Sequence, residues 1–71
     1  MLVITFNVNG IRARIHQLDA LIQKYSPDVI CLQEIKVSDE DFPYDTIEKF
    51  GYRVFNYGQK GFHGVAILCK E

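Results

Sequence analysis

The spacing of apolar residues changes along the first part of the chain and predicts a strand followed by a helix. Residues 2–8 are largely β-branched and aromatic, which is typical of a strand, and Asn9-Gly10 is a strong turn pair. Apolar residues then recur at steps of four and three, the period of an amphipathic helix. These positions are Ile11, Ile15, Leu18, Ile22 and Tyr25. Pro27 ends the helix, because the residue before a proline disfavours helical backbone.

The residues after this helix predict three more strands and a weak helical turn. Residues 28–34 form an apolar strand, so strand, helix and strand make a βαβ unit with parallel strands and a right-handed crossover. A helical turn starts at Phe42-Pro43 and closes at Gly51. Its core-facing residues are Tyr44, Ile47 and Phe50. Residues 52–57 and 64–69 predict a hairpin. The order β-α-β-α-β-β is an α/β fold.

Two of the predicted strands are apolar on both faces. In the first, Leu2, Ile4, Phe6 and Val8 alternate with Val3 and Thr5. In the fourth, Val65, Ile67 and Cys69 alternate with Ala66 and Leu68. A sheet covered on one face alternates apolar with polar residues. One good helix and one weak helix suffice for one face, so we expect something outside these 71 residues to cover the other.

The composition is that of one small globular unit. The chain has 71 residues, 48% of them apolar, which is too rich for a disordered segment. Cys31 and Cys69 lie in apolar runs without metal-ligand spacing, so we expect buried thiols in a reduced compartment. The longest apolar run, residues 65–69, is too short to cross a bilayer. Residues 1–6 are apolar, but no basic residue precedes them and Asn7 ends the run, so we expect that they are not a signal peptide. We expect a cytoplasmic chain without membrane contact.

The net charge of −1 hides an uneven distribution of charges. Residues 38–48 hold five acids and no base, so the remaining 60 residues carry a net charge of +4. A mildly basic face that meets a polyanion such as nucleic acid is therefore allowed.

Two polar residues fall where the predicted parallel strands end. Asn7 lies near the end of the first strand and Glu34 ends the second. Ligands gather beyond the carboxyl ends of parallel strands, and a carboxylate with an amide oxygen suits Mg²⁺. The alternative is that each residue only marks the beginning of a loop.

Two further segments could contact phosphate. Residues 58–64 form a glycine-rich loop in which Lys60 can approach a phosphate backbone and Phe62 a sugar or base; an ordinary hairpin turn is the alternative. The loop lacks the pattern of a P-loop. Arg12 and Arg14 follow the Asn9-Gly10 turn, where they either bind phosphate or lie on a solvated helix face.

Three blocks of sequence carry these candidates in order. They are residues 6–14 (Phe-Asn-Val-Asn-Gly-Ile-Arg-Ala-Arg), 27–36 (Pro-Asp-Val-Ile-Cys-Leu-Gln-Glu-Ile-Lys) and 58–68 (Gly-Gln-Lys-Gly-Phe-His-Gly-Val-Ala-Ile-Leu). Together they resemble the amino-terminal part of the exonuclease III/AP endonuclease family, within the endonuclease/exonuclease/phosphatase superfamily. The resemblance implies part of a four-layer α/β/β/α sandwich and dependence on Mg²⁺ or Mn²⁺. It also implies hydrolysis of DNA phosphodiesters, at 3′ ends of duplex DNA and beside abasic sites.

The resemblance also implies roles for single residues. Glu34 matches the metal-ligand glutamate, and Asn7 matches the asparagine that helps to hold the metal and the reacting phosphate, with Asn9 in support. The positions that match DNA contacts are Arg12, Lys36, Lys60, Gly61, Phe62 and His63. The sequence departs from the family at Ile35, where threonine is usual, and we expect a small packing effect there.

Hydrolysis needs more groups than these. The attacking water needs a base and the leaving oxygen needs stabilisation. The resemblance implies that a tyrosine, an Asp-x-Asn pair and an Asp-His pair supply them from later in the chain. We therefore expect residues 1–71 to be the N-terminal fragment of one such domain, inactive alone and partnered by the missing C-terminal part. The alternatives are another phosphodiesterase of the superfamily and a non-enzymatic remnant or small binding module.

Overall fold

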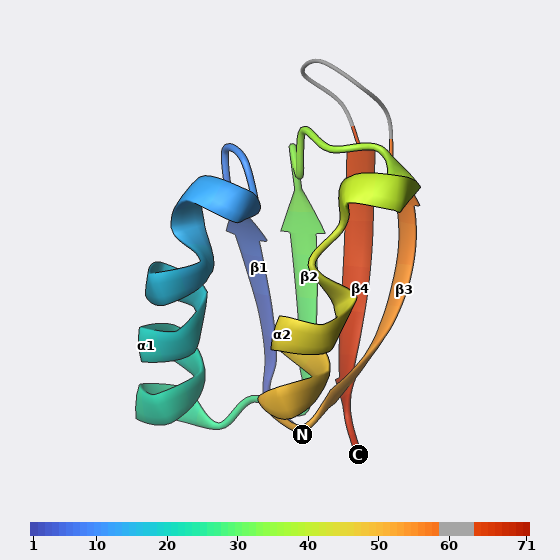
Figure 1. Ribbon diagram of the computed structural model, residues 1–71. Coiled ribbons are helices and arrows are strands. Elements are labelled where there is room, and N and C mark those ends of the chain that lie inside the picture. Colours follow the sequence, from blue (N-terminus) through green and yellow to red (C-terminus); the bar gives the residue numbers. More distant parts are fainter. Residues whose placement is uncertain (59–63) are drawn as a thin grey trace.

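The computed structural model describes residues 1–58 and 64–71 and shows a four-stranded sheet with two helices on one face (Figure 1). The elements are β1 (Val3–Asn7), α1 (Ile15–Tyr25), β2 (Val29–Gln33), α2 (Tyr44–Lys49), β3 (Tyr52–Gly58) and β4 (Gly64–Lys70), with short 3₁₀ turns η1 (Arg12–Arg14) and η2 (Asp39–Asp41). The predicted order β-α-β-α-β-β is confirmed. Within the described ranges, no helix is both long and apolar enough to cross a membrane.

The strands lie in the order β1-β2-β4-β3. β1 and β2 are parallel, and β3 pairs antiparallel with β4, as the sequence predicts. β4 also pairs antiparallel with β2, so the hairpin joins the βαβ unit through its second strand. Both chain termini lie at the end of the sheet opposite the carboxyl ends of β1 and β2 (Figure 1).

The first helix begins later than the apolar spacing predicts. Asn9 and Gly10 both have positive φ, and residues 12–14 then form a 3₁₀ turn before α1 starts at Ile15. The break lies at Arg14, whose φ of −119° and ψ of 15° are not helical. Ile11 is nevertheless fully buried, so it keeps the core position that the spacing gave it. At the other end Ser26 is left-handed and donates its N–H to the Ile22 carbonyl at 2.8 Å, just before Pro27.

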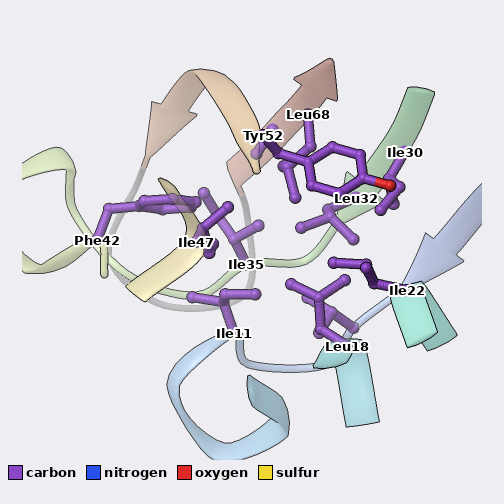
Figure 2. Packing of buried hydrophobic residues seen from close by; sticks show 12 residues of the cluster. Ile11, Leu18, Ile22, Ile30, Leu32, Ile35, Phe42, Ile47, Tyr52 and Leu68 are labelled. Atoms are coloured by element: carbon purple, nitrogen blue, oxygen red, sulfur yellow. The ribbon is translucent and has the colours of Figure 1, made fainter. Parts of the chain in front are cut away.

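The core lies between the helices and one face of the sheet (Figure 2). Its members are Val8, Ile11, Leu18, Ile22, Ile30, Leu32, Ile35, Phe42, Ile47, Tyr52, Ala66 and Leu68. Tyr52 is the largest, and its hydroxyl donates to the Pro27 carbonyl at 2.5 Å. The buried hydroxyl is therefore satisfied, and its bond ties the start of β3 to the segment that leads into β2.

The other face of the sheet is exposed and largely apolar; we call it the open face. Its most exposed side chains are 45% to 67% accessible and come from β1, β3 and β4. They are Val3, Phe55, Tyr57, Val65 and Ile67. The prediction that the chain covers one face of its sheet is confirmed for the part of the chain described, and what covers the open face stays a prediction.

The prediction that both cysteines are buried core thiols is wrong. Cys31 and Cys69 are only partly buried. In β2 the buried positions are Ile30 and Leu32, and Cys31 points the opposite way, where it pairs with Ile67 of the open face. Apolar neighbours in sequence did not distinguish the two faces, because both faces of this sheet are apolar.

Candidate functional site

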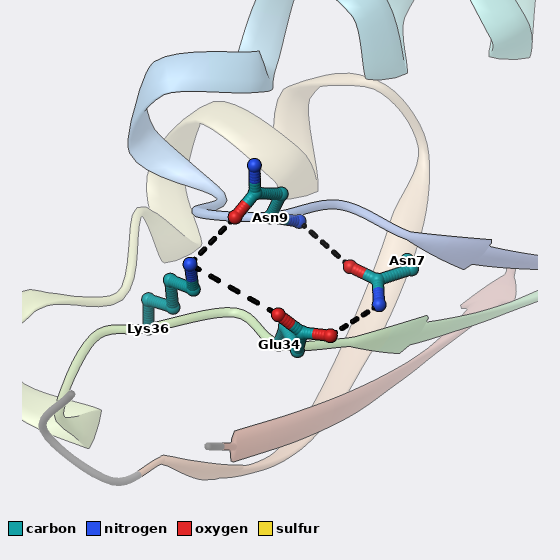
Figure 3. Close-up of polar contacts among 4 residues, drawn as sticks. All are labelled: Asn7, Asn9, Glu34 and Lys36. Carbon is teal, nitrogen blue, oxygen red and sulfur yellow. Dashed lines mark hydrogen bonds and ion pairs between the residues drawn. The ribbon is translucent and has the colours of Figure 1, made fainter. Parts of the chain in front are cut away.

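The candidate site lies where β1 and β2 end (Figure 3). Asn7 is the last residue of β1 and pairs with Gln33, the last residue of β2. Glu34 follows directly, and the Asn7 side-chain amide donates a hydrogen bond to its carboxylate. The structure thus brings together the two residues that the sequence placed at neighbouring strand ends.

Backbone hydrogen bonds continue to join the two segments beyond the strand ends. The Val8 N–H donates to the Gln33 carbonyl at 3.0 Å, and the Gly10 N–H donates to the Glu34 carbonyl at 2.9 Å. The Ile11 N–H donates to the Ile35 carbonyl, also at 2.9 Å. The loops that carry the site are therefore fixed to each other by their main chains.

Asn7 acts in this structure as a donor toward Glu34. Its Oδ1 accepts the Asn9 backbone N–H at 3.1 Å. A backbone N–H can only donate, so the amide oxygen must face it and the amide NH₂ must face the carboxylate. Asn7 thereby orients Glu34, and its prediction as a direct metal ligand rests on the remaining lone pair of Oδ1.

Lys36 completes a ring of polar contacts with these residues. Its ammonium donates to Asn9 Oδ1 at 2.6 Å and lies 3.9 Å from Glu34 Oε1. We call Asn7, Asn9, Glu34 and Lys36 the polar cluster (Figure 3). The Glu34 side chain is 43% exposed and that of Lys36 is 27% exposed, so solvent and a ligand can reach both. Exposed ion pairs stabilise a fold only slightly, so the contact between Lys36 and Glu34 contributes little to stability.

The donor set fits a hard divalent cation. Glu34 offers carboxylate oxygens and Asn7 an amide oxygen, which are ligands that Mg²⁺ accepts, with water and substrate phosphate in its other positions. Among residues 1–58 and 64–71, no group of three or more His, Cys, Asp or Glu side chains could hold a metal. Within the described residues, the polar cluster would therefore provide only some of the ligands that a metal ion needs.

The other predicted contact residues are placed differently. The Arg12 guanidinium donates to the Asp41 carbonyl at 2.9 Å, which ties η1 to η2. Nothing in the sequence signals this contact between residues 29 positions apart. Lys60, Gly61, Phe62 and His63 lie outside the described residues, so their DNA contacts stay predictions.

Comparison of the sequence with known proteins identifies relatives along the whole chain. The family model of the endonuclease/exonuclease/phosphatase family matches residues 4–71. Exodeoxyribonuclease III of Haemophilus influenzae is 63% identical over 71 residues, which are all of this chain and 27% of that protein. A DNA-(apurinic or apyrimidinic site) endonuclease of Dictyostelium discoideum is 33% identical over 73 residues, and the chain covers 20% of it. The chain thus spans about a fifth to a quarter of the length of these relatives.

Solved structures match the fold closely. An AP endonuclease from Archaeoglobus fulgidus gives a TM-score of 0.93 at 43% identity and covers 100% of this chain, which is 28% of that protein. A 3′-5′ exonuclease from Neisseria meningitidis gives a TM-score of 0.93 at 34% identity. The match covers 99% of this chain and 27% of the exonuclease. These matches confirm the predicted fold class, an α/β unit that is part of a sandwich fold. With a family model that matches 68 of its 71 residues, the chain belongs to the endonuclease/exonuclease/phosphatase family.

Proposed function

We propose that this chain carries the metal-binding edge of a DNA-repair nuclease of the exonuclease III type. The observation that carries the proposal is the contact between the Asn7 amide and the Glu34 carboxylate at the carboxyl ends of adjacent parallel strands. The names of relatives support it, since one is an exodeoxyribonuclease III and another, from Neisseria, is a 3′ phosphatase bound to a product DNA hairpin. The proposed reaction is metal-dependent hydrolysis of DNA phosphodiesters, at 3′ ends and beside abasic sites.

In this proposal each member of the polar cluster has a role. The Glu34 carboxylate holds Mg²⁺ or Mn²⁺, and Asn7 keeps that carboxylate oriented. When held there, such an ion would supply positive charge to offset the negative charge of the phosphoryl oxygens and would make a nearby water more acidic. Lys36, held by Asn9, presents an ammonium beside the same carboxylate, where a DNA phosphate would meet positive charge.

Duplex DNA is the proposed partner of this edge. The proposed backbone and minor-groove contacts are Arg12, Lys36, Lys60, Gly61, Phe62 and His63. Arg12 reaches DNA only with the guanidinium hydrogens that its bond to the Asp41 carbonyl leaves available. Lysines and arginines that neutralise phosphates make binding fall with salt, so affinity for duplex DNA should decrease steeply as ionic strength rises.

We further propose that residues 1–71 bind the metal without cleaving DNA by themselves. A positioned base and a stabiliser of the leaving oxygen are both required for hydrolysis. Within the described residues, Glu34 belongs to no group of three or more His, Cys, Asp or Glu side chains that could hold a metal, and its side-chain contacts are with Asn7 and Lys36. The proposed activity therefore uses catalytic groups from outside these 71 residues.

The deciding experiment is titration of the purified chain with Mn²⁺, followed by paramagnetic broadening of amide NMR signals. We expect broadening around residues 7, 9 and 34, and its loss in Glu34→Gln. Glu48→Gln is the matched control, because Glu48 is an exposed carboxylate on α2 and the change in charge is the same. Broadening centred on residues 38–48 in the wild type would contradict the metal site.

Incubation of the same chain with a duplex that contains an abasic site tests the requirement for further groups. We expect no cleavage in Mg²⁺. Cleavage that disappears in Glu34→Gln would show that these 71 residues already hold the complete machinery, against the proposal.

A further inference from the structure

Three of the four residues in the polar cluster have left-handed backbone. The φ angles are +47° at Asn9, +54° at Glu34 and +59° at Lys36. Asparagine adopts this region more readily than other non-glycine residues, whereas glutamate and lysine seldom do. Strained backbone of this kind persists only where the surrounding structure holds it, and it gathers at functional sites.

Ile35 lies between the two unusual residues and is fixed from three directions. Its side chain is 0% exposed and belongs to the core cluster (Figure 2). Its N–H donates to the Gly64 carbonyl at 3.2 Å, and its carbonyl accepts the Ile11 N–H at 2.9 Å. Residue 35 is thereby joined to the start of β4, to the segment after β1 and to the core.

We infer that Ile35 is a positioning residue for Glu34 and Lys36. With residue 35 held in place, the chain on each side turns through left-handed backbone. The carboxylate and the ammonium are then directed away from the core and toward each other. The pair is set before a cation or a phosphate arrives, which is the pre-organisation that a binding site needs. The inference rests on the proposed function, because it assigns Ile35 to the same site.

A second buried isoleucine provides a control that distinguishes a positioning role of Ile35 from simple packing in the core. Ile47 of α2 is also 0% exposed and belongs to the same core cluster, yet neither of its sequence neighbours belongs to the polar cluster. If Ile35 only fills space, equal truncations at the two positions should differ only in their effect on stability. If Ile35 positions the site, its truncation alone should move Glu34 and Lys36.

The test compares Ile35→Ala with Ile47→Ala, with Ile35→Val and Ile47→Val as milder pairs in case the alanine variants do not fold. The first readout needs no metal: the ¹³Cα and ¹³Cβ shifts and HN–Hα couplings of Glu34 and Lys36, which distinguish left-handed from extended backbone. The second readout is the Mn²⁺ dissociation constant. We expect Ile35→Ala to move the shifts toward extended values and to weaken Mn²⁺ binding on the order of tenfold, and Ile47→Ala to do neither.

Each failure is distinguishable from the others. Equal behaviour of the Ile35 and Ile47 variants in both readouts overturns the positioning role. In a wild type that binds Mn²⁺ through Glu34, unchanged affinity in Ile35→Ala also overturns it. A wild type that does not bind Mn²⁺ at Glu34 overturns the proposed function, and the backbone readout still decides whether Ile35 holds Glu34 and Lys36.

Discussion

Lys36 brings one positive charge to the carboxylate that is proposed to hold a metal. Its ammonium lies 3.9 Å from Glu34 Oε1 and 2.6 Å from Asn9 Oδ1. A cation that approaches Glu34 meets a carboxylate whose charge is already partly offset. A phosphate that approaches the same place is attracted by the ammonium. One side chain thus acts in opposite directions on the two proposed ligands.

Replacing Lys36 should therefore separate the two kinds of binding. We expect Lys36→Met to strengthen Mn²⁺ binding at low salt by at most about fivefold, since two charges 4 Å apart in water interact by about 1 kcal/mol. The gain should shrink in high salt because this exposed pair is screened. Duplex DNA should bind more weakly to the same variant.

Parallel titrations with Mn²⁺ and with a fluorescent duplex measure both effects. Lys49→Met removes the same charge from the last turn of α2, away from the polar cluster, and should leave Mn²⁺ affinity unchanged. Weaker Mn²⁺ binding in Lys36→Met would show that the lysine supports the metal site rather than opposing it.

At the scale of secondary-structure elements, Tyr52 connects β3 to the segment that leads into β2. Its buried hydroxyl at the start of β3 donates to the Pro27 carbonyl, just before β2. Burial, and then the nearby charge of Asp28, raise the pKa of Tyr52 above its ordinary value of 10.0. The folded chain therefore favours the neutral phenol over the phenolate more strongly than the unfolded chain does.

This shift predicts a loss of stability in alkali. Above about pH 10 the unfolded chain releases the Tyr52 proton while the folded chain keeps it, so the free energy of unfolding falls as pH rises through the raised folded pKa. Tyr52→Phe leaves the Pro27 carbonyl without its buried donor and should cost about 1–3 kcal/mol at pH 7. The difference in the free energy of unfolding between the wild type and Tyr52→Phe should become smaller above pH 10.

Urea unfolding of both proteins between pH 7 and pH 11 measures the deficit. Tyr25→Phe removes a phenol from an exposed position on α1 and controls for the change of side chain. A deficit that stays constant across this range would mean that ionisation of Tyr52 is not linked to folding.

The sequence predicts an element well when the residues that determine it are close together in the chain, and poorly when contacts distant in sequence determine it. β1, α1, β2 and the β3–β4 hairpin follow from local spacing, and the meeting of Asn7 with Glu34 follows from parallel strands. The insertion of β4 between β2 and β3 depends on contacts distant in sequence. The left-handed backbone at Glu34 and Lys36 is imposed by the tertiary anchoring of Ile35, and neither residue type signals it.

At the scale of the whole molecule, the two faces of the sheet differ in how much a substitution should lower the free energy of unfolding. Ile67 and Leu68 are neighbours in β4, but Ile67 is 45% exposed on the open face and Leu68 is 0% exposed in the core. Leu68→Thr loses apolar burial and introduces a hydroxyl among apolar side chains. Ile67→Thr removes apolar surface that water already reaches.

We expect Leu68→Thr to lower the free energy of unfolding by about 2–5 kcal/mol and Ile67→Thr to change it by less than about 1 kcal/mol. Ile67→Thr should also reduce self-association, because a large exposed apolar patch favours contacts between molecules. Urea unfolding and sedimentation velocity measure the two effects. Equal destabilisation by both substitutions would show that the open face is covered in solution.

One row of paired residues joins the open face to the polar cluster. Asn7 pairs with Gln33, which pairs with Val65, and Val65 pairs with Tyr57, so the amide that orients Glu34 stands at the margin of the apolar surface. A partner that packs on that margin would lie next to Asn7, the residue whose amide donates to the Glu34 carboxylate. Because coupled equilibria are reciprocal, any effect of an open-face partner on cation affinity at Glu34 would be matched by an equal effect of the cation on the affinity of that partner.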